Sequence, residues 1–201
     1  MLISHAKLGR KVARLKGGDP LFFSRGGDEI EALRSAGIEY EIVPGVSSVF
    51  AAAACAGIPL THRSYSSSVA FATGHEDREK LENRVKWREI AKTCDTLVIL
   101  MGVENLDQIA YELISAGLDQ QSRACAVESA SMENQKIVYF TLKEAILHQV
   151  RLNPPSVIIV GRIVEEFGES GRKEEREEGK EEDCKIEEFQ SLRVLDQSKI
   201  K

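Results

Sequence analysis

The feature that most constrains the fold is an alternation of short apolar runs with helical patterns, which continues to residue 164. Most of the apolar runs end at glycine, proline or small polar residues, as strands do where a chain turns. The pattern predicts strands at residues 12–15, 40–43, 68–73, 96–100, 124–127, 137–140 and 156–160. It predicts helices at residues 27–36, 47–56, 87–92, 106–115 and 142–150. This alternation indicates an α/β fold.

The chain is expected to divide into three parts. Residues 1–61 contain two predicted strands and two helices, too few to enclose a core, and are expected to be the remainder of an N-terminal α/β domain. Residues 62–164 are expected to form a C-terminal α/β domain with a mixed sheet, because little chain separates two of its strands. Residues 165–201 are dominated by Glu, Lys and Arg, which predicts a disordered, charged tail.

Charge and composition exclude several functions. The net charge of −5 resides in the tail, and the remaining chain is neutral with no basic stripe, so no nucleic-acid partner is expected. No apolar run approaches the roughly 20 residues that span a bilayer, and no secretory signal is recognisable. We therefore expect a soluble, cytoplasmic protein without a membrane partner. The four cysteines and four histidines are scattered, which predicts no metal site.

A first candidate site is the turn Gly17-Gly18-Asp19, which directly follows a predicted strand. The carboxyl ends of strands are where α/β folds bind ligands, and glycine lets the backbone approach a ligand closely. Free N–H groups there would suit a carboxylate, while Asp19 would suit an ammonium group. The alternative is an ordinary turn in which Asp19 caps and Pro20 sets the backbone angle.

A second strand end carries Pro44-Gly45, and Ser47 and Ser48 follow at the predicted start of a helix. These serines either line a cleft together with the first turn or simply cap the helix. Between the two loops, Arg25 precedes a second glycine pair. Its side chain either contacts an anionic substrate or pairs with Glu29.

Residues 59–77 are rich in hydrogen-bonding side chains and lie at the predicted domain hinge, a common position for ligand pockets. His62 and Arg63 are candidates to face a polycarboxylate. A serine hydrolase using Ser66–Ser68 is an alternative, although no GxSxG elbow supports it. Met101 follows the most apolar strand and either lines a cofactor pocket or belongs to the core.

Together these segments resemble the class III, tetrapyrrole methylase family. The resemblance extends in order over residues 7–164 through VARLKGGDPLFFSRGGDE, IVPGVSS, AGIPLTHRSYSSSVAFATGHE, TLVILMGV and PPSVIIVGRIV. The combination is most similar to the branch that methylates uroporphyrinogen III. It is less similar to branches that act on later corrin intermediates, diphthamide or ribosomal RNA.

The resemblance implies a two-domain α/β/α fold, a homodimer, and S-adenosyl-L-methionine as the cofactor between the domains. The implied reaction is C-methylation of uroporphyrinogen III to precorrin-2, for siroheme or cobalamin. The substrate's carboxylates call for cationic partners, for which Arg25, His62 and Arg63 are the candidates. Ala130 stands where the family usually has glycine. The residues that the resemblance places at the cofactor are Gly17, Gly18, Asp19, Phe22, Ser47, Ser48, Met101 and Ala130.

Members of the family begin with a strand and a GxGPGDP loop, followed by an acidic residue and a lysine proposed as acid/base groups. None of these motifs is present in this sequence, so no catalytic residue is assigned and the first domain is expected to be incomplete. The expectation is therefore an N-terminally truncated methyltransferase. One alternative is a non-catalytic remnant that binds cofactor weakly or associates with a full-length copy. Another is a family member acting on a later corrin intermediate.

Overall fold

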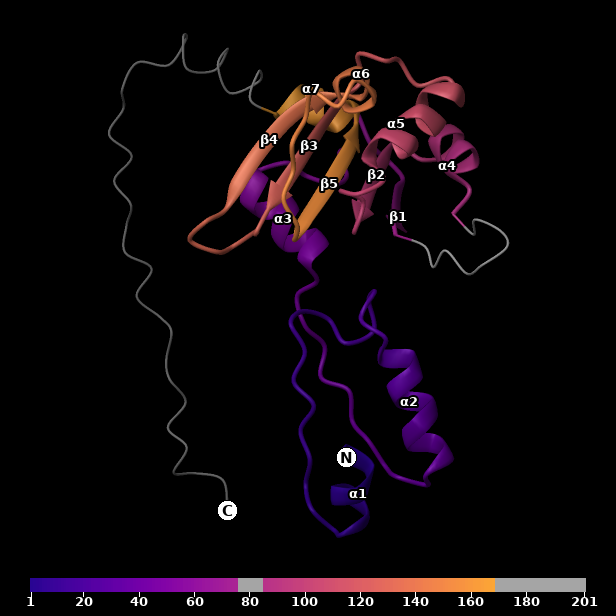
Figure 1. Ribbon diagram of the computed structural model, residues 1–201, viewed down its shortest axis with the longest axis vertical. Coiled ribbons are helices and arrows are strands. Elements are labelled where there is room, and N and C mark those ends of the chain that lie inside the picture. Colours follow the sequence, from indigo (N-terminus) through magenta and orange to yellow (C-terminus); the bar gives the residue numbers. More distant parts are fainter. Residues whose placement is uncertain (76–84, 169–201) are drawn as a thin grey trace.

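The computed structural model describes residues 1–75 and 85–168, and a five-stranded mixed sheet forms its centre (Figure 1). The strands lie in the order β1-β2-β5-β3-β4. β1 is parallel to β2, whereas β5 is antiparallel to both β2 and β3, and β4 is antiparallel to β3. The predicted mixed sheet is thereby confirmed. The strand bounds are β1 (Val69–Thr73), β2 (Thr96–Leu100), β3 (Arg123–Glu128), β4 (Lys136–Thr141) and β5 (Ser156–Gly161).

Helices cover both faces of the sheet, because successive side chains of a strand point to opposite faces. One group of helices consists of α4 (Trp87–Thr93), α5 (Leu106–Ser115) and α6 (Leu142–Ile146), and the second consists of α3 (Ser48–Ala56) and α7 (Arg162–Phe167). Leu97 and Ile99 of β2 belong to a core cluster with the first group, whereas Val98 and Leu100 belong to a cluster with the second. Both faces of β2 are therefore core.

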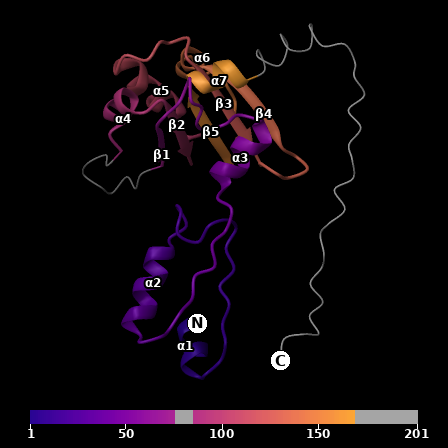
Figure 2. The same cartoon turned by 180° about the vertical axis from the view of Figure 1, so that it is seen from behind.

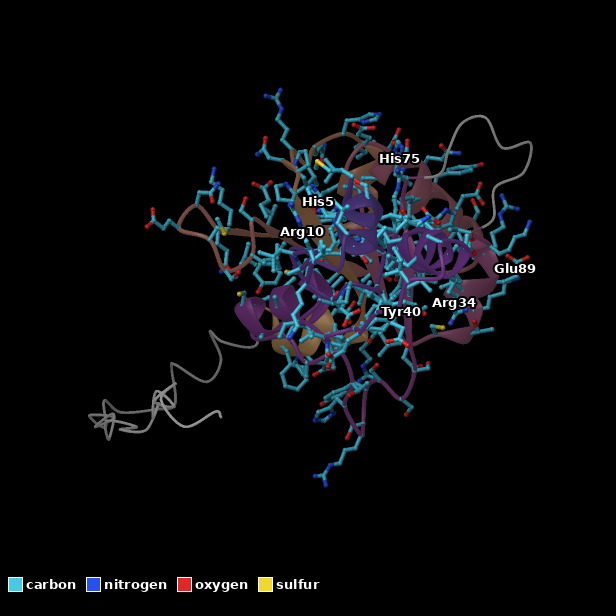
Figure 3. The ribbon with its side chains drawn as sticks, turned by 90° about the horizontal axis from the view of Figure 1, so that it is seen from below. His5, Arg10, Arg34, Tyr40, His75 and Glu89 are labelled. Carbon is cyan, nitrogen blue, oxygen red and sulfur yellow. The ribbon has the colours of Figure 1, made fainter. Side chains whose placement is uncertain are left out.

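Residues 1–46 extend away from the sheet, as both ribbon views show (Figures 1 and 2). They contain the helices α1 (Leu2–Lys7) and α2 (Gly26–Ser35), joined to the rest by irregular segments. Within this region Arg34 Nε donates to Tyr40 Oη at 3.1 Å, and Arg10 Nη1 lies 3.2 Å from His5 Nδ1 (Figure 3). Only Gly26 is buried among these 46 residues, so the region has no core of its own.

The strands predicted at residues 12–15 and 40–43 do not form, since the structure assigns no strand anywhere in residues 1–68. A strand is stabilised by the hydrogen-bond ladder and side-chain pairs that it shares with a neighbour. Neither segment is paired in a ladder within the described residues, so its apolar pattern produces extended but irregular backbone. The helices predicted around residues 27–36 and 47–56 are confirmed as α2 and α3.

Two predicted boundaries are corrected. The helix expected over residues 142–150 ends at Ile146, and His148 has a φ of 53°, outside the helical range. Residues 165–167, expected to belong to the tail, instead end α7, and the Phe167 ring lies 5.3 Å from that of His62. The predicted disorder beyond residue 168 lies outside the described residues. Within the described part of the chain, no helix has the length and apolar character needed to cross a membrane.

Candidate ligand-binding site

The candidate site lies at one edge of the sheet, where several strands end together. Since β5 is antiparallel to both β2 and β3, those two strands run in the same direction, and β1 runs parallel to them. Thr73, Leu100 and Glu128 therefore end their strands at the same edge, where β5 begins. Figure 1 shows that the ends of β2 and β3 point toward residues 1–46.

A cavity of about 910 Å³ occupies this edge. It is lined by the loops around residues 17–18 and 46 and by the start of α3. The segments that follow β1, β2 and β3 and the start of β5 complete the lining. The cavity thus brings together two of the glycine-edged loops and the strand ends that the sequence singled out. Its lining residues are Gly17, Gly18, Val46, Ser48, Ala51, His75, Leu100, Met101, Val103, Glu104, Val127, Ser129, Ala130, Ser131, Met132, Pro154, Pro155, Ser156 and Val157.

Three lining residues have an unusual backbone conformation. Met101 directly follows β2 with a φ of 53°, and Ser129 and Ser131 follow β3 with φ values of 47° and 66°. Left-handed conformations are costly for residues with a side chain, and they cluster at functional sites. Met101 is also half-exposed, so it lines the cavity and is not a core methionine.

The loops around Gly18 and Gly45 touch through their backbones. Gly18 has a φ of 119°, which side chains rarely tolerate, and a Cβ at Gly45 would collide with the Gly18 carbonyl oxygen. The two loops therefore require glycine for close approach. This contact presents Gly17 and Gly18 to the cavity on one side and delivers the chain into α3 on the other.

Lys16 anchors the first of these loops. Its side chain is only 12% exposed, and its ammonium donates to the Ser24 carbonyl oxygen at 2.5 Å and to Glu29 Oε2 at 2.8 Å. Arg14 Nε contacts the other oxygen of the same carboxylate at 3.1 Å. Hydrogen bonds from Lys16 and then from Arg14 hold the pKa of the Glu29 carboxyl below its ordinary value. These contacts tie the start of the glycine loop to Glu29 of α2 and to the Ser24 backbone.

Asp19 does not line the cavity, and its carboxylate is engaged by the backbone. Oδ1 accepts from the Leu21 N–H at 2.8 Å, and Oδ2 accepts from the Gly45 N–H at 3.3 Å. The first contact belongs to an Asp-stabilised turn, and the second joins the two glycine loops. The structure therefore favours a role for Asp19 in shaping the site.

The start of α3 forms the next part of the wall. Ser47 occupies the N-cap position and is buried, but its side chain makes no capping hydrogen bond. Ser48 and Ala51 line the cavity itself. Because the first turn of a helix has unpaired N–H groups and a partial positive charge, this wall suits an anionic group.

Phe22 and Arg25 are not among the residues that line the cavity. Phe22 packs against Phe71 of β1, with ring centroids 5.3 Å apart, and so supports the loop from beneath. Arg25 is exposed at the N-cap of α2 with a φ of 58°. The structure therefore brings neither side chain into the pocket.

His62 and Arg63 lie near the opposite edge of the sheet, where β2 begins. His62 stacks on Tyr65, with ring centroids 4.8 Å apart, and Arg63 is exposed. Ser66 is structural, because its hydroxyl is buried and lies 2.7 Å from Thr96 Oγ1. The Ser68 hydroxyl donates to Asp95 Oδ2 at 3.0 Å, and Ser67 is exposed but does not line the cavity, so the cavity gives the serine hydrolase alternative no support. His62 and Arg63 also lie outside the cavity.

Sequence reasoning did not find Glu104, Met132 or Ser156, all of which line the cavity. Their positions depend on how the segments after β2 and β3 and before β5 return to the same edge. The one available signal was their proximity in sequence to strand ends. Within residues 1–75 and 85–168, no group of three or more His, Cys, Asp or Glu gathers as metal ligands would.

Together, fold and cavity define an α/β protein that binds a small molecule beyond the carboxyl ends of its strands. The sequence matches the family of tetrapyrrole (corrin/porphyrin) methylases over residues 1–146. The chain belongs to this family.

Individual relatives agree with this assignment. The chain is 43% identical over 166 residues to uroporphyrinogen-III C-methyltransferase from Bacillus subtilis, covering 81% of this chain and 64% of the relative. It is 46% identical over 165 residues to the protein of that name from Priestia megaterium, covering 81% and 69%.

A solved structure confirms the mixed α/β fold class. It is the uroporphyrin-III C-methyl transferase from Thermus thermophilus complexed with S-adenyl homocysteine, with a TM-score of 0.73 and 37% identity. The similarity covers 83% of this chain and 72% of that one. The present chain thus spans roughly two thirds of the length of its curated relatives, 64% and 69% of the two named above.

Proposed function

We propose that the chain carries the cofactor site of an S-adenosyl-L-methionine-dependent methyltransferase that converts uroporphyrinogen III to precorrin-2. The observation that carries the proposal is the cavity in which Gly17 and Gly18, Ser48, and Met101 with Ala130 meet. The relatives' names support the substrate, and the solved relative complexed with S-adenyl homocysteine supports the cofactor.

The cavity suits this cofactor in size and chemistry. Its volume of about 910 Å³ lies within the range of roughly 300–1,000 Å³ typical of small-molecule sites. Leu100, Val127 and Val157 provide an apolar wall for a nucleoside. The backbone at Gly18 and the first turn of α3 provide N–H groups for a carboxylate. A zwitterionic nucleoside derivative needs both kinds of surface.

We propose that Gly17, Gly18, Ser47, Ser48, Met101 and Ala130 hold the cofactor, while Asp19 and Phe22 support the loop that contacts it. When bound, the cofactor supplies a methyl group activated by its sulfonium. The residues of the chain then mainly orient the reactants and exclude water, which lowers a barrier by roughly 7–11 kcal/mol in favourable cases.

Methylation of a pyrrole carbon also releases a proton, which needs an acceptor. Within the described residues, His75 and Glu104 are the ionisable side chains that line the cavity. We propose this pair as the candidates for that role.

Two measurements on the full 201-residue chain test the proposal. Isothermal titration with S-adenosylhomocysteine measures cofactor binding, and incubation with S-adenosylmethionine and uroporphyrinogen III measures precorrin-2 formation. Micromolar binding together with turnover supports the proposal. A folded chain that binds no S-adenosylhomocysteine contradicts it.

A second candidate function is cofactor binding without turnover, with catalysis dependent on association with a longer copy. The observation that favours it is the absence of a core in residues 1–46, where only Gly26 is buried. The same two measurements separate the candidates, because this one predicts binding but no product. Restored turnover on mixing with an active-site-inactivated full-length relative would support association.

We also propose that the protein acts as a homodimer in the cytoplasm, as the resemblance implies. An apolar cavity of about 650 Å³ beside α3, lined in part by Phe50, Ile58 and Phe71, supports self-association. Phe50 is 55% exposed, which is unusual for so large an apolar side chain next to a groove. Light scattering coupled to size-exclusion chromatography tests the dimer, and a mass of one chain at micromolar concentration contradicts it.

A further inference from the structure

Ser156 has a buried hydroxyl group with no hydrogen-bond partner among residues 1–75 and 85–168. It begins β5, pairs with Glu128 of β3 and lines the cavity. The residue is 8% exposed, and its Oγ is shielded from solvent. Across the described residues, no other buried side-chain oxygen or nitrogen lacks a hydrogen-bond partner. An unpaired buried hydroxyl is destabilising, so its position beside a ligand cavity needs a physical reason.

The wall that carries Ser156 is firmly held. The Ser129 N–H donates to the Pro155 carbonyl oxygen at 2.9 Å. The buried Glu128 carboxylate accepts from the Asn153 N–H at 2.7 Å and from the Asn153 side-chain amide at 3.3 Å. These contacts connect the segment before β5 to the end of β3. The position of the Ser156 backbone is therefore well defined without a bound ligand.

The lining next to Ser156 is mostly apolar. Val127 comes from the neighbouring strand β3 and Val157 from β5 itself, and Pro154 and Pro155 come from the loop before β5. A mostly apolar wall that carries a hydroxyl suits a flat heteroaromatic ring that has hydrogen-bonding atoms along one edge. The glycine loop and the start of α3 form a different part of the wall, built by residues 17–51, and that part suits the amino-acid end of a ligand.

We infer that Ser156 is a further cofactor-binding residue, whose hydroxyl recognises the purine of the cofactor. The inference rests on the proposed function and assigns the two ends of the ligand to different parts of the wall. The inference requires a staggered χ1 rotamer in which the hydroxyl faces the cavity. There it donates to a ring nitrogen or accepts from the exocyclic amine.

The test compares Ser156→Ala with the wild-type chain by isothermal titration, using two ligands. S-adenosylhomocysteine contains the purine and the amino acid, whereas 5′-methylthioadenosine contains the purine without the amino acid. The substitution is expected to weaken both ligands equally, by roughly 3- to 10-fold, the effect of one hydrogen bond. Ser115→Ala, at the exposed end of α5, is the control and leaves both affinities unchanged. The melting temperature of free Ser156→Ala is expected to equal or exceed that of wild type, because an unpaired hydroxyl is removed.

Each result has a definite meaning. Unchanged affinity of Ser156→Ala for both ligands overturns the inference but leaves the proposed function intact. Weakening of S-adenosylhomocysteine alone also overturns it, because Ser156 would then contact the amino-acid end. A fall in melting temperature that accounts for the lost affinity overturns it in favour of a structural role. Failure of the wild-type chain to bind either ligand overturns the proposed function and this inference together.

Discussion

Residues 1–46 and the sheet region, residues 69–168, contain similar apolar patterns but bury them very differently. In the sheet region Val98 and Ile99 are 0% exposed, and both faces of β2 are covered by helices. In residues 1–46 the corresponding apolar runs remain open to solvent, with Leu15 at 85% and Val43 at 74% exposed. The same residue types therefore form core in one region and surface in the other.

The difference shows that an apolar run forms a buried strand only where neighbouring strands pair with it. β2 has β1 on one side and β5 on the other, so its backbone is paired along both edges. Residues 12–15 and 40–43 have no such neighbour in the described residues. The part of residues 1–46 next to the cavity is held by the backbone contact between Gly18 and Gly45 and by the hydrogen bonds of Lys16 and Asp19. Stability should therefore reside in the sheet, and ligand affinity should depend on both regions.

The largest expected effect comes from truncating matched isoleucines in the two regions. Ile99→Ala removes a fully buried side chain from β2 and should lower the free energy of unfolding by about 2–5 kcal/mol. Ile42→Ala removes a side chain that is 39% exposed and should cost under about 1 kcal/mol. Urea unfolding followed by circular dichroism measures both. Equal losses would show that residues 1–46 are as firmly packed as the sheet.

A smaller effect is expected where the two glycine loops touch. Gly45→Ala forces a Cβ against the Gly18 carbonyl oxygen, and such overpacking costs about 1–3 kcal/mol. Because the displaced loop lines the cavity, S-adenosylhomocysteine should bind roughly tenfold more weakly, equivalent to about 1.4 kcal/mol. Gly27→Ala is the control, since it lies in α2 with open space around it. If the two variants bind S-adenosylhomocysteine with similar affinity, the contact between Gly45 and Gly18 does not contribute to the binding site.

The next prediction distinguishes two roles for Asp19. If Asp19 shapes the loop by accepting N–H groups, Asp19→Asn keeps an acceptor and should weaken S-adenosylhomocysteine by less than about threefold. Asp19→Ala keeps none and should weaken it by about tenfold. Isothermal titration of both variants decides. If Asn proves as damaging as Ala, the carboxylate contacts the ammonium group of the ligand directly.

The smallest expected effect is a dependence on pH through Glu29. Its pKa in the folded chain is lowered by Lys16 and Arg14. The stability that the ionised carboxylate contributes is therefore fully present above the unfolded-state pKa, and it is lost as the pH falls through the folded-state pKa. Because the ion pairs of Glu29 with Lys16 and Arg14 are partly exposed, Glu29→Gln should weaken the binding of S-adenosylhomocysteine by only about twofold at pH 7. As the pH falls below this lowered pKa, the affinities of wild type and variant should converge. A ratio that stays constant with pH would show that the charge of Glu29 plays no part.

Much of the sheet could be predicted from sequence because each of its strands has a recognisable local pattern of apolar residues. Residues 97–101 are continuously apolar and lie between Thr96 and Gly102, and residues 96–100 form β2 as expected. Residues 12–15 and 40–43 satisfy the same local rule, but strand formation also needs a neighbour, which no local pattern reveals. The helix α7 was missed because its residues, from Arg162, lead into a charged stretch. Its apolar side chains Ile163 and Val164 nevertheless pack on the sheet.

The site was predictable where backbone geometry demanded particular residues. Glycine is required at position 18 by its positive φ and at position 45 by close approach to the Gly18 carbonyl oxygen, and both glycines closely follow predicted strands in the sequence. The opposite wall was less visible, because Glu104 and Ser156 reach the cavity only through the way that β2, β3 and β5 are arranged in the sheet. His62 and Arg63 lie outside the cavity, which the sequence could not show for a related reason: a predicted hinge does not reveal which edge of the sheet it faces.

The central claim is that one ligand contacts both regions at the carboxyl edge of the sheet. Hydrogen exchange followed by mass spectrometry, with and without S-adenosylhomocysteine, tests it directly. The account predicts slower exchange on binding in four separate segments at once, around residues 17–18, 45–48, 101–104 and 129–132, with residues 62–68 unchanged. Slower exchange confined to one region, or appearing around residues 62–68 instead, would contradict it.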